Sequence, residues 1–407
     1  MRNFFIKLTA IYFFLIFIFI NSLTFVSLIP EKFLRANIYQ SIKEFKKQGL
    51  YPTFGLPFRK IIIDNFTNAL MFNVAYSIDE KKPFSSAMMG VFYDNTINKN
   101  DQILNLEMTY QKKDIKPVNY YRYWHGYLLY LRPLLVFFSF NQIRLILGFI
   151  LYLLFVIFIT FCWNKLGNKI SLAFMFGFLT VDFFFLAFSP NFFGPFFVGL
   201  FLGVIYLSQK EKIKNFLFLF FIAGGLTSFF DLLTAPLVSL GILLLCFLTT
   251  SKKNSFKQVF FACLFWALGY IFIWLTKWIL VEFLNFPEAI KAGLSQVLYR
   301  SLAIPDNDFS YLKTLKLNLF QLIGYDKSNK FFFLLISMVA FFYLIKNFHS
   351  NIRKIKNLYP LFFLVALPYF WYLAAANHSY IHVWFTYRNQ LMTVVALTLI
   401  FFQAVDN

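Results

Sequence analysis

Long apolar runs are the feature that most constrains this chain. The first extends from about Leu8 to Ile29, and the others lie near 143–163, 170–188, 192–208, 215–231, 233–250, 259–277, 331–346, 359–375 and 389–405. A helix needs about 20 apolar residues to cross a bilayer core about 30 Å thick, and these runs are close to that length. We therefore expect an all-α polytopic membrane protein with about ten transmembrane helices, forming a single transmembrane domain over residues 1–407.

Composition and charge agree with this class. The chain is 59% hydrophobic and 14% charged, which leaves too little polar surface for a soluble protein of this size. Its formal net charge is +20, but the lysines are scattered between apolar runs and form no single basic patch, so we expect the lipid bilayer and no nucleic acid as a partner. All three cysteines lie inside apolar runs, which predicts neither a disulfide framework nor a metal site.

The distribution of Lys and Arg predicts the topology. The segment Gly126–Phe140 is also apolar, and whether it crosses the membrane decides the side of every later loop. If it does not cross, nearly all cations of the short loops lie on the side of the N-terminus, and Arg388 stands alone on the other side. If it crosses, this bias is reversed, and Arg132 lies at a costly depth. We therefore predict that the segment does not cross. Both termini are then cytoplasmic, and the chain lies in the cytoplasmic (inner) membrane of a bacterium.

This topology gives two large extracytoplasmic loops, residues 31–142 and 278–330. In the first loop, a proline and a glycine bound a predicted helix, Pro30 and Gly49. Its apolar side chains recur at helical spacing: Leu34, Ile38, Ile42 and Phe45. Because the opposite face is basic, we expect this helix to lie in the headgroup plane with its apolar side toward lipid. Residues 78–120 are polar and turn-rich.

Asp64 is the first candidate functional residue. It stands directly before an apolar segment that is expected to form a second helix of the outer loop, with Phe66, Leu70 and Val74 on one side. An Asp at this position can cap the helix by accepting its free amide hydrogens. A carboxylate fixed there, at the outer face, can also act as a general base toward an acceptor hydroxyl. The two roles are compatible, and the sequence leaves both open.

Two outer segments are dense in aromatic and basic side chains. The first contains His125 and Arg132, and the second contains His378, His382 and Arg388. Tyr and Trp gather at membrane interfaces for packing reasons alone. The alternative is a binding site in which aromatic faces contact a sugar or an isoprenoid while His and Arg bind phosphate.

A shared anionic ligand would bring the two segments together around one outer cavity. The side chains of Arg132, His378 and Arg388 should then point into a pocket that Asp64 also lines. Asp182, in the outer half of the third apolar run, should face the same cavity, since ionisable groups at such depths usually face a cavity or a partner. The sequence indicates no third zinc ligand beside the two histidines, so no cofactor is identified, and a divalent cation is left open.

The layout of these features resembles the GT-C class of membrane glycosyltransferases. Those enzymes have a first helix followed by a long outer loop with an acidic residue and interfacial "jaw" helices. The helix opened by Asp64 is similar to their loop motif. The segment His125-Gly126-Tyr127-Leu128, followed by Arg144, is similar to a His-Pro-Pro-Leu segment followed by an Arg that opens the next membrane helix. Gly126 and Tyr127 stand where those enzymes have prolines.

The resemblance implies an inverting transferase of cell-envelope glycan assembly. It would move a sugar from a polyprenyl-phosphate carrier to a hydroxyl of a glycan, lipid or protein acceptor at the outer face. Asp64 would be the catalytic base, and the substrate would be bound by the remaining candidates: Asp182, His125, Arg132, His378, His382 and Arg388. Three alternatives stay open. They are an envelope polysaccharide polymerase or ligase that does not need Asp64, a lipid-carrier flippase or transporter without catalysis, and a purely structural membrane protein.

Overall fold

Apolar helices form the body of the molecule. The computed structural model describes residues 2–56, 59–95, 100–209, 215–250, 256–284, 287–302, 309–324 and 358–405, so the predicted helix at 331–346 lies outside the described residues. Four described helical segments are long and apolar enough to cross a membrane: α1 (Arg2–Ser27), α7 (Phe140–Leu166), Pro190–Gln209 (η2, Pro190–Phe192, with α9, Phe193–Gln209) and α12 (Phe256–Phe283). Shorter apolar helices accompany them: α10 (Phe216–Phe230), α11 (Leu237–Thr250) and α17 (Tyr359–Ala374).

The helices pack closely side by side. α9 lies against α7 and α11, and α8 (Asn168–Thr180) lies against α7 and α20 (Leu391–Val405). The most extensive contact joins α10 to α12. Glycines allow that approach, since a Cβ atom on Gly224 would lie 1.9 Å from the carbonyl oxygen of Trp266. Small residues at the crossing of two membrane helices serve this purpose generally.

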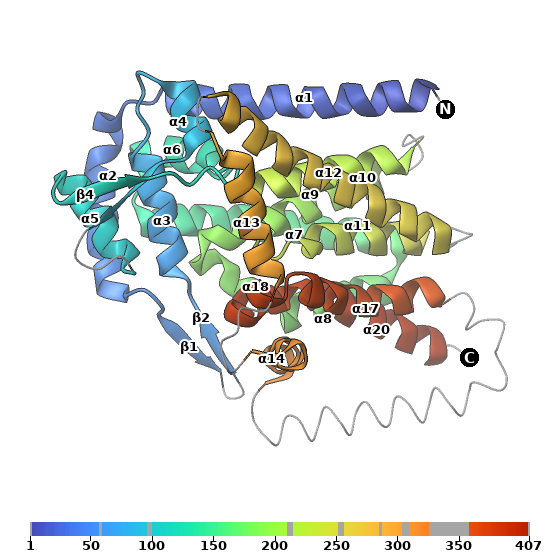
Figure 1. Ribbon diagram of the computed structural model, residues 1–407. Coiled ribbons are helices and arrows are strands. Elements are labelled where there is room, and N and C mark those ends of the chain that lie inside the picture. Colours follow the sequence, from blue (N-terminus) through green and yellow to red (C-terminus); the bar gives the residue numbers. More distant parts are fainter. Residues whose placement is uncertain are drawn as a thin grey trace.

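The two ends of the bundle differ in character. Figure 1 shows the N-terminus and the C-terminus at one end, and the elements α2 to α6 with both small sheets at the other. We call the latter the outer end, following the predicted topology. The segment predicted not to cross forms α6 (Leu128–Phe137), whose ten residues rise about 15 Å, half of the hydrocarbon thickness.

The first helix of the outer end has the predicted bounds and a different environment. α2 (Glu31–Gln48) ends at Gly49, whose backbone N–H donates to the carbonyl of Phe45. The predicted apolar side is fully buried, but protein covers it: α2 packs on α3 (Asn65–Tyr76), α5 (Gln102–Gln111), α6 and α7. The Phe45 ring, for example, stacks on Phe140 at a centroid distance of 4.1 Å. The expectation that this face contacts lipid is therefore wrong.

Residues 78–120 contain more regular structure than their polar sequence predicts. α4 (Pro83–Met89) and α5 alternate with two strands, β3 (Phe92–Asn95) and β4 (Ile115–Val118), which pair in antiparallel register with Phe92 opposite Val118. A second antiparallel pair precedes α3, formed by β1 (Thr53–Leu56) and β2 (Arg59–Ile62). Asp101 caps α5 by accepting hydrogen bonds from the amides of Ile103 and Leu104.

The sequence predicts one helix over the apolar run at 170–188, but the structure has two helical segments there. α8 ends at Thr180, and a 3-10 helix, η1 (Phe183–Phe188), follows. Asp182 lies between them in the left-handed region, with φ of +56°, and its carboxylate accepts a hydrogen bond from the Tyr387 hydroxyl at 2.6 Å. The break lets residues 189–192 turn toward the outer end, where they reach Asp64.

Short helices at the C-terminal side complete the outer end. α12 continues to Phe283, and two amphipathic helices follow it, α13 (Ala289–Ser301) and α14 (Tyr311–Ile323). These two helices pack on the elements that join α17 to α20: α18 (Ala376–Ile381), α19 (Val383–Thr386) and η4 (Tyr387–Gln390).

The orientation of the bundle can be tested with single cysteines. In a background without the three native cysteines, a cysteine at the exposed positions Asn168 or Gln209 should resist an impermeant thiol reagent in intact cells, because both lie at the end of the bundle that is predicted to be cytoplasmic. A cysteine at Lys113, exposed at the outer end, is the matched control and should be labelled. The reverse pattern would overturn the topology.

Candidate functional site

Asp64 is a buried helix cap with one acceptor site to spare. Its carboxylate accepts hydrogen bonds from the backbone N–H of Thr67 at 2.9 Å, the Thr67 hydroxyl at 2.7 Å and the Asn191 amide at 3.3 Å. Its own backbone N–H donates to the Ser189 hydroxyl at 3.1 Å. A carboxylate offers about four lone-pair positions, so these three bonds leave about one for a further donor. The predicted capping role is confirmed, and the geometry leaves a general-base role open.

Burial raises the pKa of two acidic groups in this region, Asp64 and Tyr51. Desolvation raises the pKa of Asp64 above its usual range, against the opposing effect of the hydrogen bonds from Thr67 and Asn191. The half-buried hydroxyl of Tyr51 lies nearby, and desolvation together with the charge of Asp64 raises its pKa to about 12. The Tyr51 ring stands between two other rings, Phe66 and Trp384, each at a centroid distance of 6.1 Å. Asp64 is thus next to an aromatic surface that is partly open to solvent.

The segment η2 links Asp64 to Arg388. Asn191 bonds to Asp64, and the ring of the next residue, Phe192, lies 4.7 Å from the guanidinium carbon of Arg388. The Phe192 ring also contacts Phe385 at 5.8 Å. Residues that are far apart in the sequence are therefore in one continuous set of contacts, which we call the Asp64–Arg388 cluster: Asp64, Asn191, Phe192, His382, Trp384, Phe385 and Arg388.

Arg388 is buried with incomplete partners. The side chain is 1% exposed, and its one hydrogen bond in the described structure runs from Nη1 to the carbonyl of Trp384 at 3.0 Å. Its Nε is buried without a partner, and no carboxylate of the described ranges forms an ion pair with it. A buried cation in this state is costly unless a ligand or another group compensates it.

Other buried nitrogens close to Arg388 also lack partners within the described residues. They are His382 Nδ1, Trp384 Nε1 and Asn389 Nδ2. The His382 ring stacks on Phe385 at 5.0 Å and meets Trp384 edge-on at 5.1 Å, so these groups belong to the same cluster. Native proteins pair almost all buried polar groups, and a local concentration of unpaired nitrogens indicates a site for a ligand rich in acceptors.

The paired histidines are neutral. Burial lowers the pKa of His382 to about 4, assisted by the charge of Arg300, and burial lowers that of His378 well below its usual range. The two rings lie 4.8 Å apart, and His378 Nε2 contacts the carbonyl of Leu233 at 2.8 Å. These residues therefore supply hydrogen bonds near neutral pH, and the positive charge of the region comes from arginine.

Asp182 joins the cluster from the side of the bundle. The Tyr387 hydroxyl donates a hydrogen bond to the Asp182 carboxylate. The Tyr387 ring lies 4.9 Å from the guanidinium carbon of the next residue, Arg388. Asp182 is buried. That Asp182 faces a cavity shared with Asp64 and Arg388 stays a prediction.

Arg132 has a different role from Arg388. Its Nε donates to the carbonyl of Val26 at 3.0 Å, and its two terminal nitrogens donate to the carbonyls of Ile29 and Ala75. Val26 and Ala75 lie in the last turns of α1 and α3, and Ile29 follows the end of α1 by two residues. The helix dipole is negative at these ends, and few helical donors are left for their carbonyls. Burial lowers the pKa of Arg132 to about 10, which still leaves it charged at neutral pH.

Arg132 therefore does not share a pocket with Arg388 and Asp64, and that prediction is wrong. Ala75 and Asp64 stand at opposite ends of α3, about 16 Å apart by helical rise. All three guanidinium nitrogens of Arg132 are already used by carbonyls.

His125 is likewise engaged within the protein. Its Nε2 contacts the carbonyl of Tyr120 at 2.7 Å and its Nδ1 contacts the Tyr127 hydroxyl at 3.2 Å. Burial, with the charges of Lys277 and Arg122, lowers its pKa to about 3. The Gly126 N–H donates to the carbonyl of Phe229, which anchors this segment on the end of α10. The structure thus brings together the second aromatic-basic segment, Asp64 and Asp182, and it places the first segment apart from them.

Arg300 is a functional candidate that the sequence did not single out. It lines a cavity of about 210 Å³ with Leu233, Tyr270, Trp274 and Trp371. Its Nη1 and the Trp371 Nε1 are buried without partners among the described residues. Its positive charge acts on both histidines of the pair, because it lowers the pKa of His378 and of His382. An arginine in a loop that is predicted to be extracytoplasmic, where the positive-inside bias offers no reason for one, was the available signal.

Within the described ranges, no three His, Cys, Asp or Glu side chains form a group that could hold a metal ion. No protein-family model, curated protein or solved structure matches the chain.

The two buried arginines should differ in their effect on stability. Arg132→Gln removes the guanidinium donors from the carbonyls of Ile29 and Ala75 and leaves the carbonyl of Val26 with the Ile29 amide alone. At roughly 1–3 kcal/mol for each buried carbonyl left without a donor, the melting temperature of the purified protein should fall clearly. Arg388→Gln removes a buried cation without a carboxylate partner, so its melting temperature should stay close to that of the wild type or rise. An equal loss in both variants would contradict this division of roles.

Proposed function

We propose that the protein is a membrane glycosyltransferase that uses a polyprenyl-phosphate-linked sugar at the outer face of a bacterial inner membrane, in envelope glycan assembly. One observation carries the proposal. A buried arginine without a carboxylate partner, Arg388, lies in one cluster with unpaired donors and with the buried carboxylate of Asp64. A phosphate leaving group and a hydroxyl nucleophile need this combination of a cation and a base.

Asp64 is suited to accept the proton. A general base works best when its pKa approaches the working pH, and burial shifts the pKa of Asp64 in that direction. Its hydrogen bonds to Thr67 and Asn191 hold the carboxylate in one orientation. The aromatic surface of Tyr51 and Trp384 beside it offers an apolar face on which a sugar ring can stack.

Arg388 is suited to bind the phosphate. Its Nε, His382 Nδ1 and Trp384 Nε1 are donors without partners in the described structure, given the neutral histidine tautomer with hydrogen on Nδ1. Phosphate oxygens accept such bonds, and arginine binds them with two parallel hydrogen bonds. Donors fixed before the reaction stabilise negative charge as it develops on the leaving group.

The proposed reaction is a single displacement. The oxygen of the acceptor hydroxyl forms a bond to the anomeric carbon of the sugar as the bond from that carbon to the phosphate oxygen breaks. The proton of the hydroxyl passes to Asp64, and the electron pair of the broken bond remains on the carrier phosphate beside Arg388. The configuration at the anomeric carbon is thereby inverted.

A second candidate function is an envelope polysaccharide polymerase or ligase. The unpaired donors of Arg388, His382 and Trp384 favour it, because they bind phosphate whether or not Asp64 ionises. The cavity at Arg300 adds another cation beside the same histidines. The two functions differ in their need for the carboxylate.

Replacement of Asp64 tests the base. Asp64→Asn should reduce glycan formation by about 10²–10⁴-fold, since an amide cannot take the proton. The protein should remain folded, because Asn caps helices well and because Asn191 can turn its unpaired Oδ1 toward the new amide. The readout is the envelope glycan profile, by mass spectrometry, of a deletion strain complemented with each variant.

Asp101→Asn is the matched control, because Asp101 also caps a helix of the outer end through its carboxylate and lies outside the cluster. It should restore the profile. Restoration by Asp64→Asn as well would reduce Asp64 to a cap and favour the polymerase.

Binding of the carrier tests Arg388. The purified protein should bind a short-chain polyprenyl monophosphate, and Arg388→Lys should weaken this binding about tenfold or more, because an ammonium group lacks the planar pair of donors. Arg35→Lys, at an exposed arginine of α2, should bind like the wild type. If Arg388→Lys binds the polyprenyl monophosphate as tightly as the wild type does, the phosphate does not bind at Arg388.

A further inference from the structure

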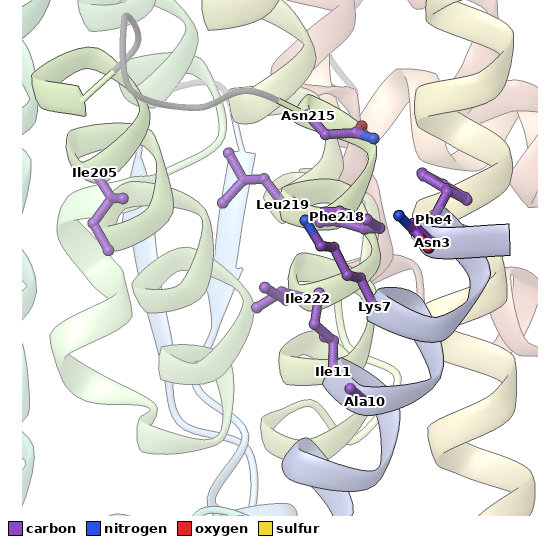
Figure 2. Close-up of a pocket in the computed structure, with 10 residues that line it drawn as sticks. All are labelled: Asn3, Phe4, Lys7, Ala10, Ile11, Ile205, Asn215, Phe218, Leu219 and Ile222. Carbon is purple, nitrogen blue, oxygen red and sulfur yellow. The ribbon is translucent and has the colours of Figure 1, made fainter. Parts of the chain in front are cut away.

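A large open groove lies at the end of the bundle opposite the proposed active site. It has a volume of about 820 Å³ and is bounded by the first turns of α1, by α10 and by Ile205 of α9. Figure 2 shows apolar side chains along most of its length: Phe4, Ala10, Ile11, Ile205, Phe218, Leu219 and Ile222. In a bilayer, lipid chains are the available material to fill a space of this size and composition.

The groove has one polar end. Lys7 projects from α1 toward Phe218 and Leu219, and the amides of Asn3 and Asn215 lie at the same end (Figure 2). Lys7 is exposed, and no described carboxylate forms an ion pair with it. It lies five residues into α1, about 7.5 Å along the axis from Arg2, which places its ammonium group at headgroup depth if α1 crosses the bilayer.

The opposite side of α1 provides an internal comparison. A second groove of about 390 Å³ is lined by Leu8, Thr9, Tyr12, Phe13, Phe221 and Phe272, without a charged side chain. α1 therefore has apolar space on both sides, and most of its apolar surface faces away from the protein. A cation is present on one side only.

We propose that the groove at Lys7 binds an anionic phospholipid of the leaflet at the N-terminal end of the bundle. The acyl chains fill the apolar part between α1 and α10, the phosphate meets the Lys7 ammonium, and the amides of Asn3 and Asn215 bind headgroup oxygens. Charge complementarity favours an anionic lipid over a zwitterionic one. It also disfavours a second copy of this chain, whose corresponding α1 surface carries the same Lys7. The bound lipid fixes α1, whose first turns are otherwise held mainly by the contacts of Phe4 with Phe218 and Phe265.

Native mass spectrometry of the purified full-length protein tests the site. The probes are phosphatidylglycerol and phosphatidylcholine with identical acyl chains, added in equal amounts. The wild type should retain phosphatidylglycerol preferentially. Lys7→Gln should reduce that preference about fivefold, the effect of one basic residue at a membrane surface. Arg2→Gln is the matched control, because it removes one charge from the exposed start of the same helix without lining the groove.

A third variant tests the apolar part. Ala10→Trp places a bulky ring in the apolar part of the groove and leaves every charge in place, so it should reduce the retention of both lipids. Equal retention of the two lipids by the wild type would overturn the proposal, as would equal effects of Lys7→Gln and Arg2→Gln. A dimer of lipid-free protein that Ala10→Trp dissociates would assign the groove to a second copy instead. Because no step measures glycan formation, these outcomes are independent of the proposed activity.

Discussion

The arrangement of the outer end depends on the hydrogen bonds of Arg132. A membrane helix that stops leaves carbonyl groups without donors, and each needs a partner when water is excluded. One guanidinium supplies donors to the end of α1 through Val26 and Ile29, and to the end of α3 through Ala75. The same contact holds the C-terminal end of α3 beside the end of α1, and Asp64 stands at the other end of α3.

A second constraint is the interruption between α8 and α9. If residues 170–188 formed one continuous helix, the chain would continue straight and would not turn before α9. The left-handed backbone at Asp182 and the hydrogen bond from Tyr387 stop it instead. The following residues, Ser189 and Asn191, then bond to Asp64, and Phe192 lies under Arg388. The interruption thus connects the first outer loop to the last one.

The sequence predicted the parts of the fold that periodicity and end signals determine. Most of the apolar runs within the described residues form helices, α2 kept its bounds between Pro30 and Gly49, and Asp64 caps α3. The break at Asp182 was not predictable, because no glycine or proline stands at it and the hydrogen-bond partner of Asp182, Tyr387, is 205 residues away in the sequence. The short elements of residues 78–120 depend on tertiary contacts in the same way, for example the pairing of Asn95 with Asn105 across β3 and α5.

Residue type alone could not separate the two buried arginines. Arg132 and Arg388 both follow aromatic residues in outer segments, and the same reasoning assigned both to phosphate. Their partners distinguish them: one donates to helix-end carbonyls through all three nitrogens, and the other keeps a buried Nε without a partner. The ends of α1 and α3 therefore need Arg132 for folding. The buried charge of Arg132 is explained in this way without a ligand.

The unpaired nitrogens of the Asp64–Arg388 cluster have no such partners among the described residues. Each buried donor without a partner costs about 1–3 kcal/mol, a substantial share of the roughly 5–15 kcal/mol by which a folded protein is stable. Three such nitrogens belong to residues in mutual contact, His382, Trp384 and Arg388, and a fourth is on the next residue in the sequence, Asn389. An apolar side chain of similar size at these positions would avoid the cost of a buried donor without a partner. Their retention next to the Asp64 carboxylate is explained if an acceptor-rich anion occupies the site during function, and a sugar phosphate at the membrane surface has that chemistry.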